Sequence, residues 1–413
     1  MSQASTARGD LLARVLDPAS RPDPYPIYAE LRGAPVALQD DGTYVVSTYA
    51  EIERLLHDPR ISSDERRSAR GAGALAASGR LAPAGQPASP PFIFLDPPDH
   101  DRIRRLVMGQ LTPELVGDMH HRIVALVRGF LDARRGIGRL DVVDDLAYPL
   151  PVAVICELLG VPRDDEPRFH GWATALARGL DPAQGMSEDE IAGAARAAAQ
   201  MLEYLGGLVA ARRARPARDL ISGLVAGEDP AGRMGERELL ATLALLLIAG
   251  HETTVNLVAN GTLALMRHPE AAARLRREPE LAVTLVEEVL RHDPPVQFRT
   301  RTTLAEIEVA GVTIPRAATV VLLLASGSRD ERRFPRADAF VPDRSDNAHL
   351  GFGGGIHYCV GAPLARLEAQ VALGEIARRL VRPRLLQDPP PYRDNAALRG
   401  PRHLPLAFDA IVD

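Results

Sequence analysis

The sequence contains no lysine, so all 49 of its basic residues are arginine. Chemistry that needs a lysine, such as Schiff-base formation or phosphate binding by a P-loop lysine, is therefore excluded. Aromatic residues make up only 4% of the chain, so its core must consist mostly of leucine, valine and alanine. The formal net charge of -5 argues against nucleic acid as a bulk partner.

Cysteine is also scarce. The two cysteines, Cys156 and Cys359, cannot form a disulfide framework, so we expect a reducing, cytoplasmic setting. Cys156 lies in an apolar stretch and is predicted to be a packed core thiol. The first residues contain no apolar segment, so we expect neither a signal peptide nor a membrane anchor. The longest apolar run, Leu239 to Gly250, is too short to span a bilayer and predicts a buried core helix.

Helical patterns dominate the chain, and no linker-like stretch divides it evenly. Near the N-terminus the sequence predicts a hairpin around Asp41-Gly42, followed by a helix from Tyr49 to His57. Further along, one long helix is expected from Glu188 to Arg213. Residues 61–91 lack periodicity and are followed at once by an apolar segment. A loop of this kind is more often a lid or a binding loop than a domain boundary.

The segment from Phe352 to Pro363 is the most informative part of the sequence. Its three consecutive glycines allow the backbone to approach a large flat group without side-chain clashes. Cys359 stands just before a predicted helix that has Pro363 in its first turn. The N-terminus of a helix favours a thiolate, because unpaired N–H groups and the helix dipole face it. A lone cysteine in a glycine-rich turn would otherwise be a buried, inert thiol.

A second motif, Ala249-Gly250-His251-Glu252-Thr253-Thr254, lies in a helical pattern. A glycine beside a threonine pair is a place where a long helix tends to open. The hydroxyl of Thr253 can bond back to the carbonyl of Ala249, which loosens the helical ladder. Threonines are common in helices, so this motif alone is a weak signal.

Asp96-Pro97-Pro98 predicts the start of another helix, with Asp96 as its cap and Pro97 in its first position. His100 and Arg104 lie one turn apart on one face of this helix. By itself that pattern is equally typical of a solvated basic face. Arg102 and Arg105 point elsewhere, and we expect them to stay free for a partner.

The spacing Phe-Gly-x-Gly-x-His-x-Cys-x-Gly, from Phe352 to Gly361, resembles the haem-binding loop of the cytochrome P450 family. The other motifs follow the family's order, and the resemblance covers Pro24 to Pro405. It implies a mainly α fold with small β-sheets, the cytochrome P450 fold. A single triangular domain over residues 1–413 would hold haem b between the long central helix and the helix after the cysteine. Loop 348–361 would carry the iron ligand, and residues 61–93 would close over the substrate.

The resemblance also implies a role for the residues of each motif. Cys359 would ligate the iron, while the catalytic residues Thr253 and Glu252 would hydrogen-bond dioxygen and relay protons through water. The residues expected to contact the haem or its propionates are His100, Arg104, Arg301, His357, Phe352, Gly353, Gly361, Ala249 and Gly250. A structural triad would consist of Glu288, Arg291 and Arg344. The family's usual Asn-Arg-Asp is Ser328-Arg329-Asp330 here, which puts one local hydrogen bond in doubt.

Matching positions suggest a largely apolar substrate pocket with one amide, lined by Phe92, Ile93, Leu245, Ile248, Ala249, Val296, Gln297, Ala397 and Leu398. We therefore expect a lipophilic small molecule with a polar handle, processed in secondary metabolism. The sequence shows no dinucleotide or flavin fingerprint, so electrons should come from a separate ferredoxin with its NAD(P)H-dependent reductase. The expected docking residues on this monomer are Arg102, Arg105 and Arg366.

The resulting hypothesis is a haem-thiolate monooxygenase that inserts one oxygen atom of dioxygen into a C–H or C=C bond. A peroxide-driven haem-thiolate enzyme fits the same loop, but it would not need Glu252 and Thr253. A haem-binding sensor or carrier without catalysis would need neither the proton relay nor a closing lid. Product formation with reduced ferredoxin and dioxygen, compared with peroxide alone, discriminates the three.

Overall fold

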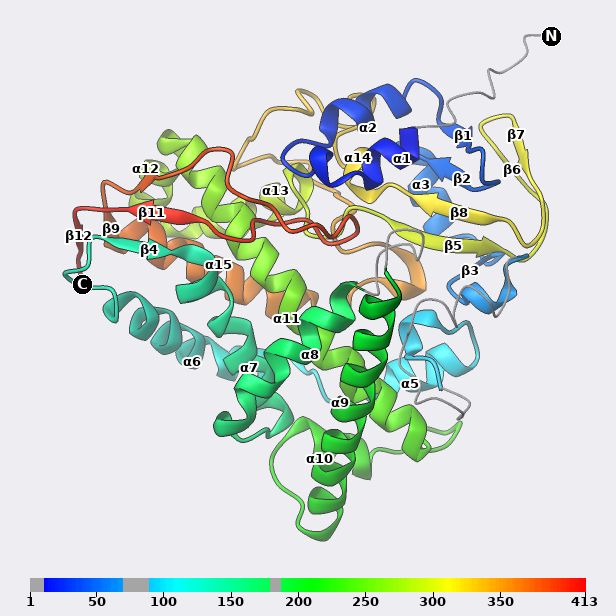
Figure 1. The fold of residues 1–413 in the computed structure, drawn as a ribbon, viewed down its shortest axis with the longest axis horizontal. Coiled ribbons are helices and arrows are strands. Elements are labelled where there is room, and N and C mark those ends of the chain that lie inside the picture. Colours follow the sequence, from blue (N-terminus) through cyan, green and yellow to red (C-terminus); the bar gives the residue numbers. More distant parts are fainter. Residues whose placement is uncertain (1–10, 70–88, 179–186) are drawn as a thin grey trace. The chain divides into compact units, whose positions relative to one another are not determined.

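The computed structural model describes residues 11–69, 89–178 and 187–413 (Figure 1). The chain forms two compact units, each assembled from segments that are far apart in the sequence. Unit 1 comprises residues 1–61, 118–150 and 253–413, and unit 2 comprises residues 62–117 and 151–252. The single domain expected over the whole chain stays a prediction. Most of the predicted lid, residues 70–88 of 61–93, lies outside the described residues.

The larger sheet belongs to unit 1 and has the strand order β1-β2-β8-β5-β3. Strands β1 (Val36–Leu38) and β2 (Tyr44–Val46) form the predicted antiparallel hairpin. Strand β8 (Thr319–Leu322) pairs in parallel with β2 and antiparallel with β5 (Arg299–Thr303). The short β3 (Ile61–Ser62) completes the sheet. Arg301, expected to contact the haem or its propionates, lies inside β5 opposite Val320, so its backbone is fixed by strand pairing.

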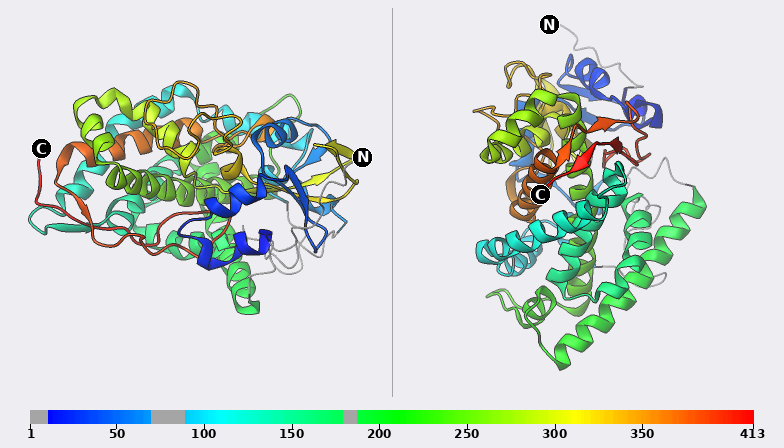
Figure 2. Two further views of the ribbon diagram at one scale, coloured as in Figure 1. Left: turned by 90° about the horizontal axis from the view of Figure 1, so that it is seen from above. Right: turned by 90° about the vertical axis from the view of Figure 1, so that its left-hand side faces the viewer.

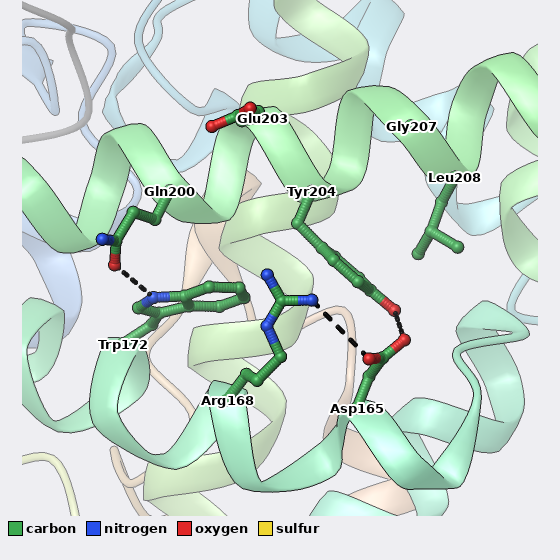
Figure 3. A pocket seen from close by; sticks show the side chains of 8 residues that line it. All are labelled: Asp165, Arg168, Trp172, Gln200, Glu203, Tyr204, Gly207 and Leu208. Carbon is green, nitrogen blue, oxygen red and sulfur yellow. Dashed lines mark hydrogen bonds and ion pairs between the residues drawn. The ribbon is translucent and has the colours of Figure 1, made fainter.

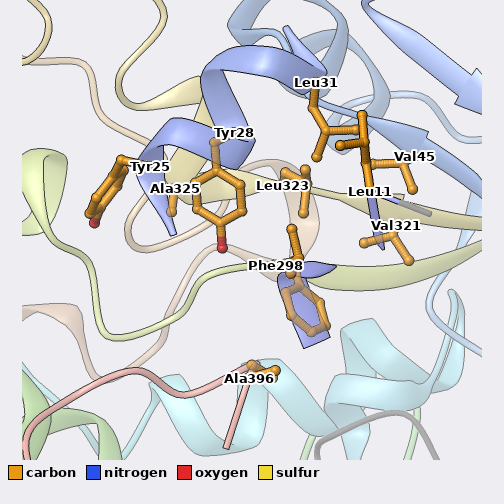
Figure 4. Close-up of a cluster of buried hydrophobic side chains, with 12 residues drawn as sticks. Leu11, Tyr25, Tyr28, Leu31, Val45, Phe298, Val321, Leu323, Ala325 and Ala396 are labelled. Carbon is orange, nitrogen blue, oxygen red and sulfur yellow. The ribbon is translucent and has the colours of Figure 1, made fainter. Parts of the chain in front are cut away.

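Helices α1 (Leu11–Leu16) and α2 (Tyr25–Leu31) pack against this sheet (Figures 1 and 2). Their apolar residues share a buried cluster with residues of β2, β8 and the segments around Phe298 and Ala396 (Figure 4). Aromatic rings are few, but Tyr25 and Tyr28 meet edge to face, 5.8 Å apart. Apart from Phe298, the other buried residues of the cluster are leucine, valine and alanine, as the composition predicts.

A second buried cluster of unit 1 involves α3 (Tyr49–Leu56), α14 (Leu324–Gly327) and the hairpin of β6 (Ile307–Val309) and β7 (Val312–Ile314). The first amide of α3, that of Tyr49, donates to the carboxylate of Asp330 at 3.0 Å. This bond fixes the start of α3, and α3 ends one residue before His57. This end of α3 contacts the loop of residues 348–361 that contains Cys359, called the cysteine loop from here on.

The rest of unit 1 is helical with short strand pairs. Its helices include α12 (Pro269–Arg277), α13 (Ala282–His292) and α15 (Ala362–Arg379), with α6 (Pro113–Asp132) starting in unit 2. A three-stranded sheet joins β10 (Arg384–Leu385), β11 (Pro405–Ala407) and β4 (Arg139–Asp141), while β9 (Leu380–Val381) pairs with β12 (Ala410–Ile411). Strand β4 was not predicted, because three residues without alternation give no strand signal.

Unit 2 contains α5 (Asp99–Met108), most of α7 (Pro149–Leu159), α8 (Glu166–Arg178), α9 (Glu188–Ala214) and α10 (Leu220–Ala226). The predicted long helix is α9. The prediction that a helix starts after Asp96 is wrong, since α5 begins at Asp99. Instead of capping it, the Asp96 carboxylate binds Ser62 Oγ at 2.5 Å and the Ser63 amide at 3.1 Å.

Helix α11 (Glu236–Arg267) is the longest helix among the described residues. By length and composition it could cross a membrane, but 78% of its most apolar window is buried inside the protein. It is therefore a core helix, as predicted, and it extends well beyond the expected run. The helix continues without interruption through Ala249 to Thr254, where the sequence suggested an opening.

Candidate active site

The loop that precedes α15 is held by its own backbone hydrogen bonds. The amide of Gly353 donates to the Leu350 carbonyl at 2.8 Å, and the amide of Cys359 donates to the Phe352 carbonyl at 3.1 Å. Gly353 and Gly355 have φ values of +72° and +60°, which side chains rarely tolerate. Two of the three consecutive glycines are therefore required by the backbone path itself. The loop presents Cys359 in one fixed orientation.

Cys359 is partly buried, and neither it nor Cys156 forms a disulfide. Gly361 is the residue before α15, and its carbonyl accepts the Ala365 amide at 2.9 Å. A side chain added at Gly361 would come within 4.0 Å of the Cys359 sulfur. The sulfur thus lies beside the N-terminus of an 18-residue helix, where the peptide dipoles stabilise negative charge. Cys156 is buried in α7, as predicted.

Arg366 on α15 braces the same loop. Its guanidinium donates to both carboxylate oxygens of Glu287 on α13, at 2.7 and 2.8 Å. It also lies 4.6 Å from the centre of the Phe352 ring and 3.2 Å from the Tyr358 hydroxyl. His349 Nε2 lies 3.1 Å from Oε2 of the same carboxylate. Burial alone would raise the pKa of Glu287, but the hydrogen bonds from Arg366 and His349 outweigh it and lower this pKa to about 2.

The structure brings the predicted triad together. Arg291 donates two hydrogen bonds of 2.8 Å to Glu288, and Arg344 reaches the same carboxylate at 3.1 Å. The side chains of Glu288 and Arg291 are completely buried, so each charge depends on the other. Arg291 also donates to the carbonyl of Ser328, whose hydroxyl in turn accepts the Leu350 amide at 3.1 Å. The serine in place of the family's asparagine therefore still bonds the start of the cysteine loop.

One face of α11 is partly exposed, while the residues on either side of it are buried. Leu245, Ala249, Gly250 and Thr253 are exposed or partly exposed, although most of the residues between them are buried. Their spacing of about one turn places them on one face of the helix. The open residues at the centre of this face are small, which leaves room beside the helix backbone. The face thus joins Thr253, expected to hydrogen-bond dioxygen, with Ala249 and Gly250, expected beside the haem, and Leu245, expected in the substrate pocket.

Glu252 lies in the interior of the protein. Its side chain is almost fully buried, and its carboxylate lies 3.9 Å from Nδ1 of the equally buried His251. A residue that exchanges protons directly with solvent should be accessible, so any relay through Glu252 must pass through interior groups. Sequence reasoning gave His251 no role, because burial of a polar residue in an apolar helix is not visible from the motif.

The groups expected near the propionates come from both units. In unit 2, His100 and Arg104 lie one turn apart on α5, as predicted, and His100 is fully buried. Burial lowers the pKa of His100, although its 2.8 Å contact with Asp101 partly opposes this. In unit 1, Arg301 is largely buried in β5, and His357 is partly exposed in the 3-10 turn Gly355–His357.

The expectation that Arg102 and Arg105 stay free is wrong. Arg102 is bound to Glu238 at 2.5 Å and only 12% of its side chain is exposed. Arg105 binds Asp229 through two hydrogen bonds of 2.7 and 3.1 Å, with 57% of its side chain exposed. Both arginines are neutralised by carboxylates that are more than 120 residues away in the sequence. Of the two, only Arg105 offers substantial surface to a partner.

The amide of Gln297, expected to bind a polar handle on the substrate, is already used inside the protein. Its side-chain amide donates to the Pro294 carbonyl at 2.7 Å and accepts from the Tyr28 hydroxyl at 3.0 Å. The residue is 1% exposed, so both ends of the amide are used inside unit 1. Ala397 and Leu398 are also buried there, with Val296 paired to Leu398. In unit 2, Phe92 and Ile248 are buried, while Ile93 and Leu245 are partly exposed.

A pocket of about 770 Å³ lies between α8 and α9, and none of the predicted site residues lines it (Figure 3). The Arg168 guanidinium lies over Trp172 and Tyr204, 5.3 and 5.0 Å from their ring centres. The Tyr204 hydroxyl donates to Asp165 at 2.7 Å, and Trp172 Nε1 donates to Gln200 at 3.0 Å. These contacts join the two helices side by side, so this group clamps α8 to α9.

A mainly helical fold that fixes a cysteine at the start of a helix in a glycine-rich loop is the arrangement of a haem-thiolate protein. The cytochrome P450 family model matches residues 209–402. Cytochrome P450 monooxygenase PikC of Streptomyces venezuelae is 38% identical over 94% of this chain and 91% of its own length. The 6-deoxyerythronolide B hydroxylase of Saccharopolyspora erythraea is 35% identical, covering 94% of this chain and 96% of its own.

Among solved structures, ligand-free CYP164A2 of Mycobacterium smegmatis matches with a TM-score of 0.89 and 43% identity. The match covers 97% of this chain and 100% of that chain. The chain belongs to the cytochrome P450 family. The expected fold class, the class of monooxygenase and the cofactor haem b are thereby confirmed. Members of the family use dioxygen and redox partners and bind lipophilic substrates.

Proposed function

We propose that this monooxygenase inserts one oxygen atom of dioxygen into a C–H or C=C bond of a lipophilic small molecule, with Cys359 as the iron ligand. The observation that carries the proposal is the position of Cys359, fixed by the loop's backbone bonds directly before α15. Haem bound there supplies the activation of dioxygen and the transfer of an oxygen atom. Binding, orientation and proton supply are left to the chain.

The residues present fit a haem group. A thiolate is the expected donor, and the loop glycines Gly353 and Gly361 offer a surface with little side-chain bulk beside it. In unit 1 the groups available to a propionate are Arg301 and His357, and in unit 2 they are His100 and Arg104. Because burial lowers its pKa, His100 would be neutral at neutral pH and would act as a hydrogen-bond donor.

On α11, Ala249 and Gly250 would leave space for dioxygen, and the hydroxyl of Thr253 would hold a proton on the same open face. The buried carboxyl group of Glu252 would supply that proton from the interior, with His251 Nδ1 as its neighbour at 3.9 Å. A buried relay of this kind limits the entry of water, which keeps electrons and protons directed to the substrate.

Electrons would come from a ferredoxin and its NAD(P)H-dependent reductase, because the sequence carries no flavin or dinucleotide fingerprint. Arg105 is the best exposed of the three docking residues, while Arg102 and Arg366 are mostly enclosed by their ion pairs. The substrate would be held mainly by apolar contacts, since Gln297 is not available as a polar group. We expect a cytoplasmic monomer.

The test begins with the carbon monoxide complex of the reduced protein. Thiolate ligation by Cys359 should give a red-shifted absorption band, and Cys359→Ser should abolish it. Cys156→Ala, which changes the buried thiol of α7, should keep the band. An absorption like that of a histidine-ligated globin in the native protein would refute Cys359 as ligand.

The second measurement compares oxidants, using a panel of lipophilic compounds. Candidates are first selected by the spectral change that accompanies loss of the iron's water ligand. Reduced ferredoxin with dioxygen should form product, and peroxide alone should support much slower turnover. Equal turnover with peroxide alone would identify a peroxide-driven enzyme, and binding without product under either condition would identify a carrier.

A further inference from the structure

His57, the residue directly after α3, contacts the cysteine loop across 298 positions of sequence. Its Nε2 accepts a hydrogen bond from the backbone amide of Gly355 at 3.1 Å. Its Nδ1 lies 2.9 Å from the carbonyl oxygen of Glu53, one turn back on the same helix. His57 and Gly355 both belong to unit 1.

These two bonds determine the proton position on the ring. A backbone carbonyl can only accept, so Nδ1 must carry the hydrogen that it shares with Glu53. A backbone amide can only donate, so Nε2 must be the bare nitrogen of a neutral imidazole. The Glu53 carboxylate, 3.4 Å from Nδ1, favours a hydrogen at that same nitrogen. The ring is thus held in a single tautomer that can accept from Gly355.

At Gly355 the loop backbone lies close against the end of α3. A side chain at Gly355 would come within 2.1 Å of the Leu56 carbonyl, so the loop backbone runs directly against the end of α3. Gly355 also accepts the Tyr358 amide at 3.1 Å, in the turn that leads to Cys359. The amide bound by His57 therefore belongs to the short turn that sets where the sulfur points.

We propose that His57 is a positioning residue of the cysteine loop, which it holds through the hydrogen bond from the Gly355 amide to Nε2. The inference rests on the proposed role of Cys359 as iron ligand. Without this acceptor, the Gly355 amide faces solvent or an apolar group, and the turn before the cysteine gains freedom. The expected consequence is easier movement of the sulfur and easier conversion of the thiolate-ligated form to a thiol-ligated one.

The experiment uses the haem-loaded protein and three variants. His57→Leu removes the acceptor, while His57→Gln places a carbonyl oxygen near the position of Nε2 and should restore the bond. His120→Leu is the matched control, because His120 is an exposed histidine on α6. The first readout is the rate at which the reduced carbon monoxide complex loses its thiolate band in mild urea. The second is hydrogen exchange of the loop peptide that contains Gly355.

Loss of one neutral hydrogen bond should accelerate both processes about fivefold in His57→Leu, with His57→Gln and His120→Leu close to the native protein. Native rates in His57→Leu would overturn the proposal. Equal acceleration in His57→Leu and His57→Gln would also overturn it, because ring packing on Gly354 would then be the cause. If His57→Leu does not fold, the exchange rate in His57→Gln still decides, since a fivefold rise there contradicts rescue. Absence of the thiolate band in the native protein would refute the role of Cys359 instead.

Discussion

Glu287 on α13 accepts two hydrogen bonds from Arg366 on α15, at 2.7 and 2.8 Å, and Arg366 at the same time covers the Phe352 ring. A charge that we expected to face a redox partner is therefore used to brace the cysteine loop. The Glu287 side chain is mostly buried, with 24% of it exposed. The first consequence of the pair is for the acid stability of the protein.

The first prediction concerns Glu287→Gln. Because the pKa of Glu287 is lowered from 4.5 to about 2, the charged carboxylate stabilises the folded state above pH 4.5. That contribution, on the order of 3 kcal/mol, is lost as pH falls from 4.5 towards 2. We expect the variant to be less stable than the native protein at pH 7, and the difference to shrink at pH 3.

Urea denaturation at the two pH values measures this difference. Glu270→Gln, at an exposed carboxylate of α12, is the control and should change stability by less than about 1 kcal/mol. A difference for Glu287→Gln that stays constant between pH 7 and pH 3 would show that the carboxylate charge contributes nothing.

The second prediction separates Thr253 from Glu252. Thr253→Ala removes a hydroxyl from the open face of α11, so electron consumption should continue while product yield falls and peroxide is released. Glu252→Gln keeps the shape of the buried side chain but removes its acid, so turnover should slow by about tenfold or more with substrate binding nearly unchanged. The amounts of product and peroxide formed and of NAD(P)H consumed are measured in the same reaction.

Thr262→Ala is a matched control for the first change. Thr262 lies on the same helix, and its hydroxyl bonds back to the Val258 carbonyl at 2.8 Å in the buried part of unit 1. It should remain fully coupled. Full coupling in Thr253→Ala together with native turnover in Glu252→Gln would remove both residues from the proton path.

The third prediction concerns docking through Arg105. Arg105→Glu places a negative charge beside Asp229 and should slow reduction by ferredoxin, most strongly at low salt. Reduction by dithionite should be unchanged. Stopped-flow measurement of both rates over a range of salt concentrations tests this.

The exchange variant, Arg105→Asp with Asp229→Arg, tells lost docking from lost structure. It restores an ion pair while it moves the positive charge to the neighbouring position. If ferredoxin binding depends on positive charge at this place on the surface, the exchange variant should recover part of the rate of reduction by ferredoxin. If dithionite reduction slows in Arg105→Glu as well, the pair is structural and the partner binds elsewhere.

The fourth prediction concerns the clamp between α8 and α9. Burial, followed by the hydrogen bond to Asp165, raises the pKa of the Tyr204 hydroxyl, so this group stays a neutral donor well above pH 7. Tyr204→Phe removes the bond to Asp165 and should lower the free energy of unfolding by about 1 kcal/mol. Hydrogen exchange in both helices should increase together.

Trp172→Phe removes the bond to Gln200 but keeps an aromatic ring, and it should loosen the same two helices. Faster exchange confined to one helix in either variant would show that α8 and α9 are not coupled through this cluster. Unchanged exchange in both variants would show that the clamp contributes no stability.

Much of the fold could be predicted because its signals are local. The limits of α3 and α9 agree with the sequence to within one residue, since apolar periodicity and turn residues act over a few positions. The start of α5 was misplaced because an aspartate before prolines looks like a helix cap, and its distant partners Ser62 and Ser63 are not visible locally. Strand β4 was missed because its pairing, not its sequence, makes it a strand.

By itself the sequence determined the cysteine loop, the order of the motifs and therefore the class of enzyme. Fixed spacing within a dozen residues carries this information, because adjacent positions along the chain are necessarily close in space. The tertiary structure alone decided which charges are available. It paired Arg102 with Glu238, Arg366 with Glu287 and His57 with Gly355, across 136, 79 and 298 positions of sequence. Such partners are selected by the packing of whole elements, and a charged group such as Arg102 leaves water only where a counterpart meets it.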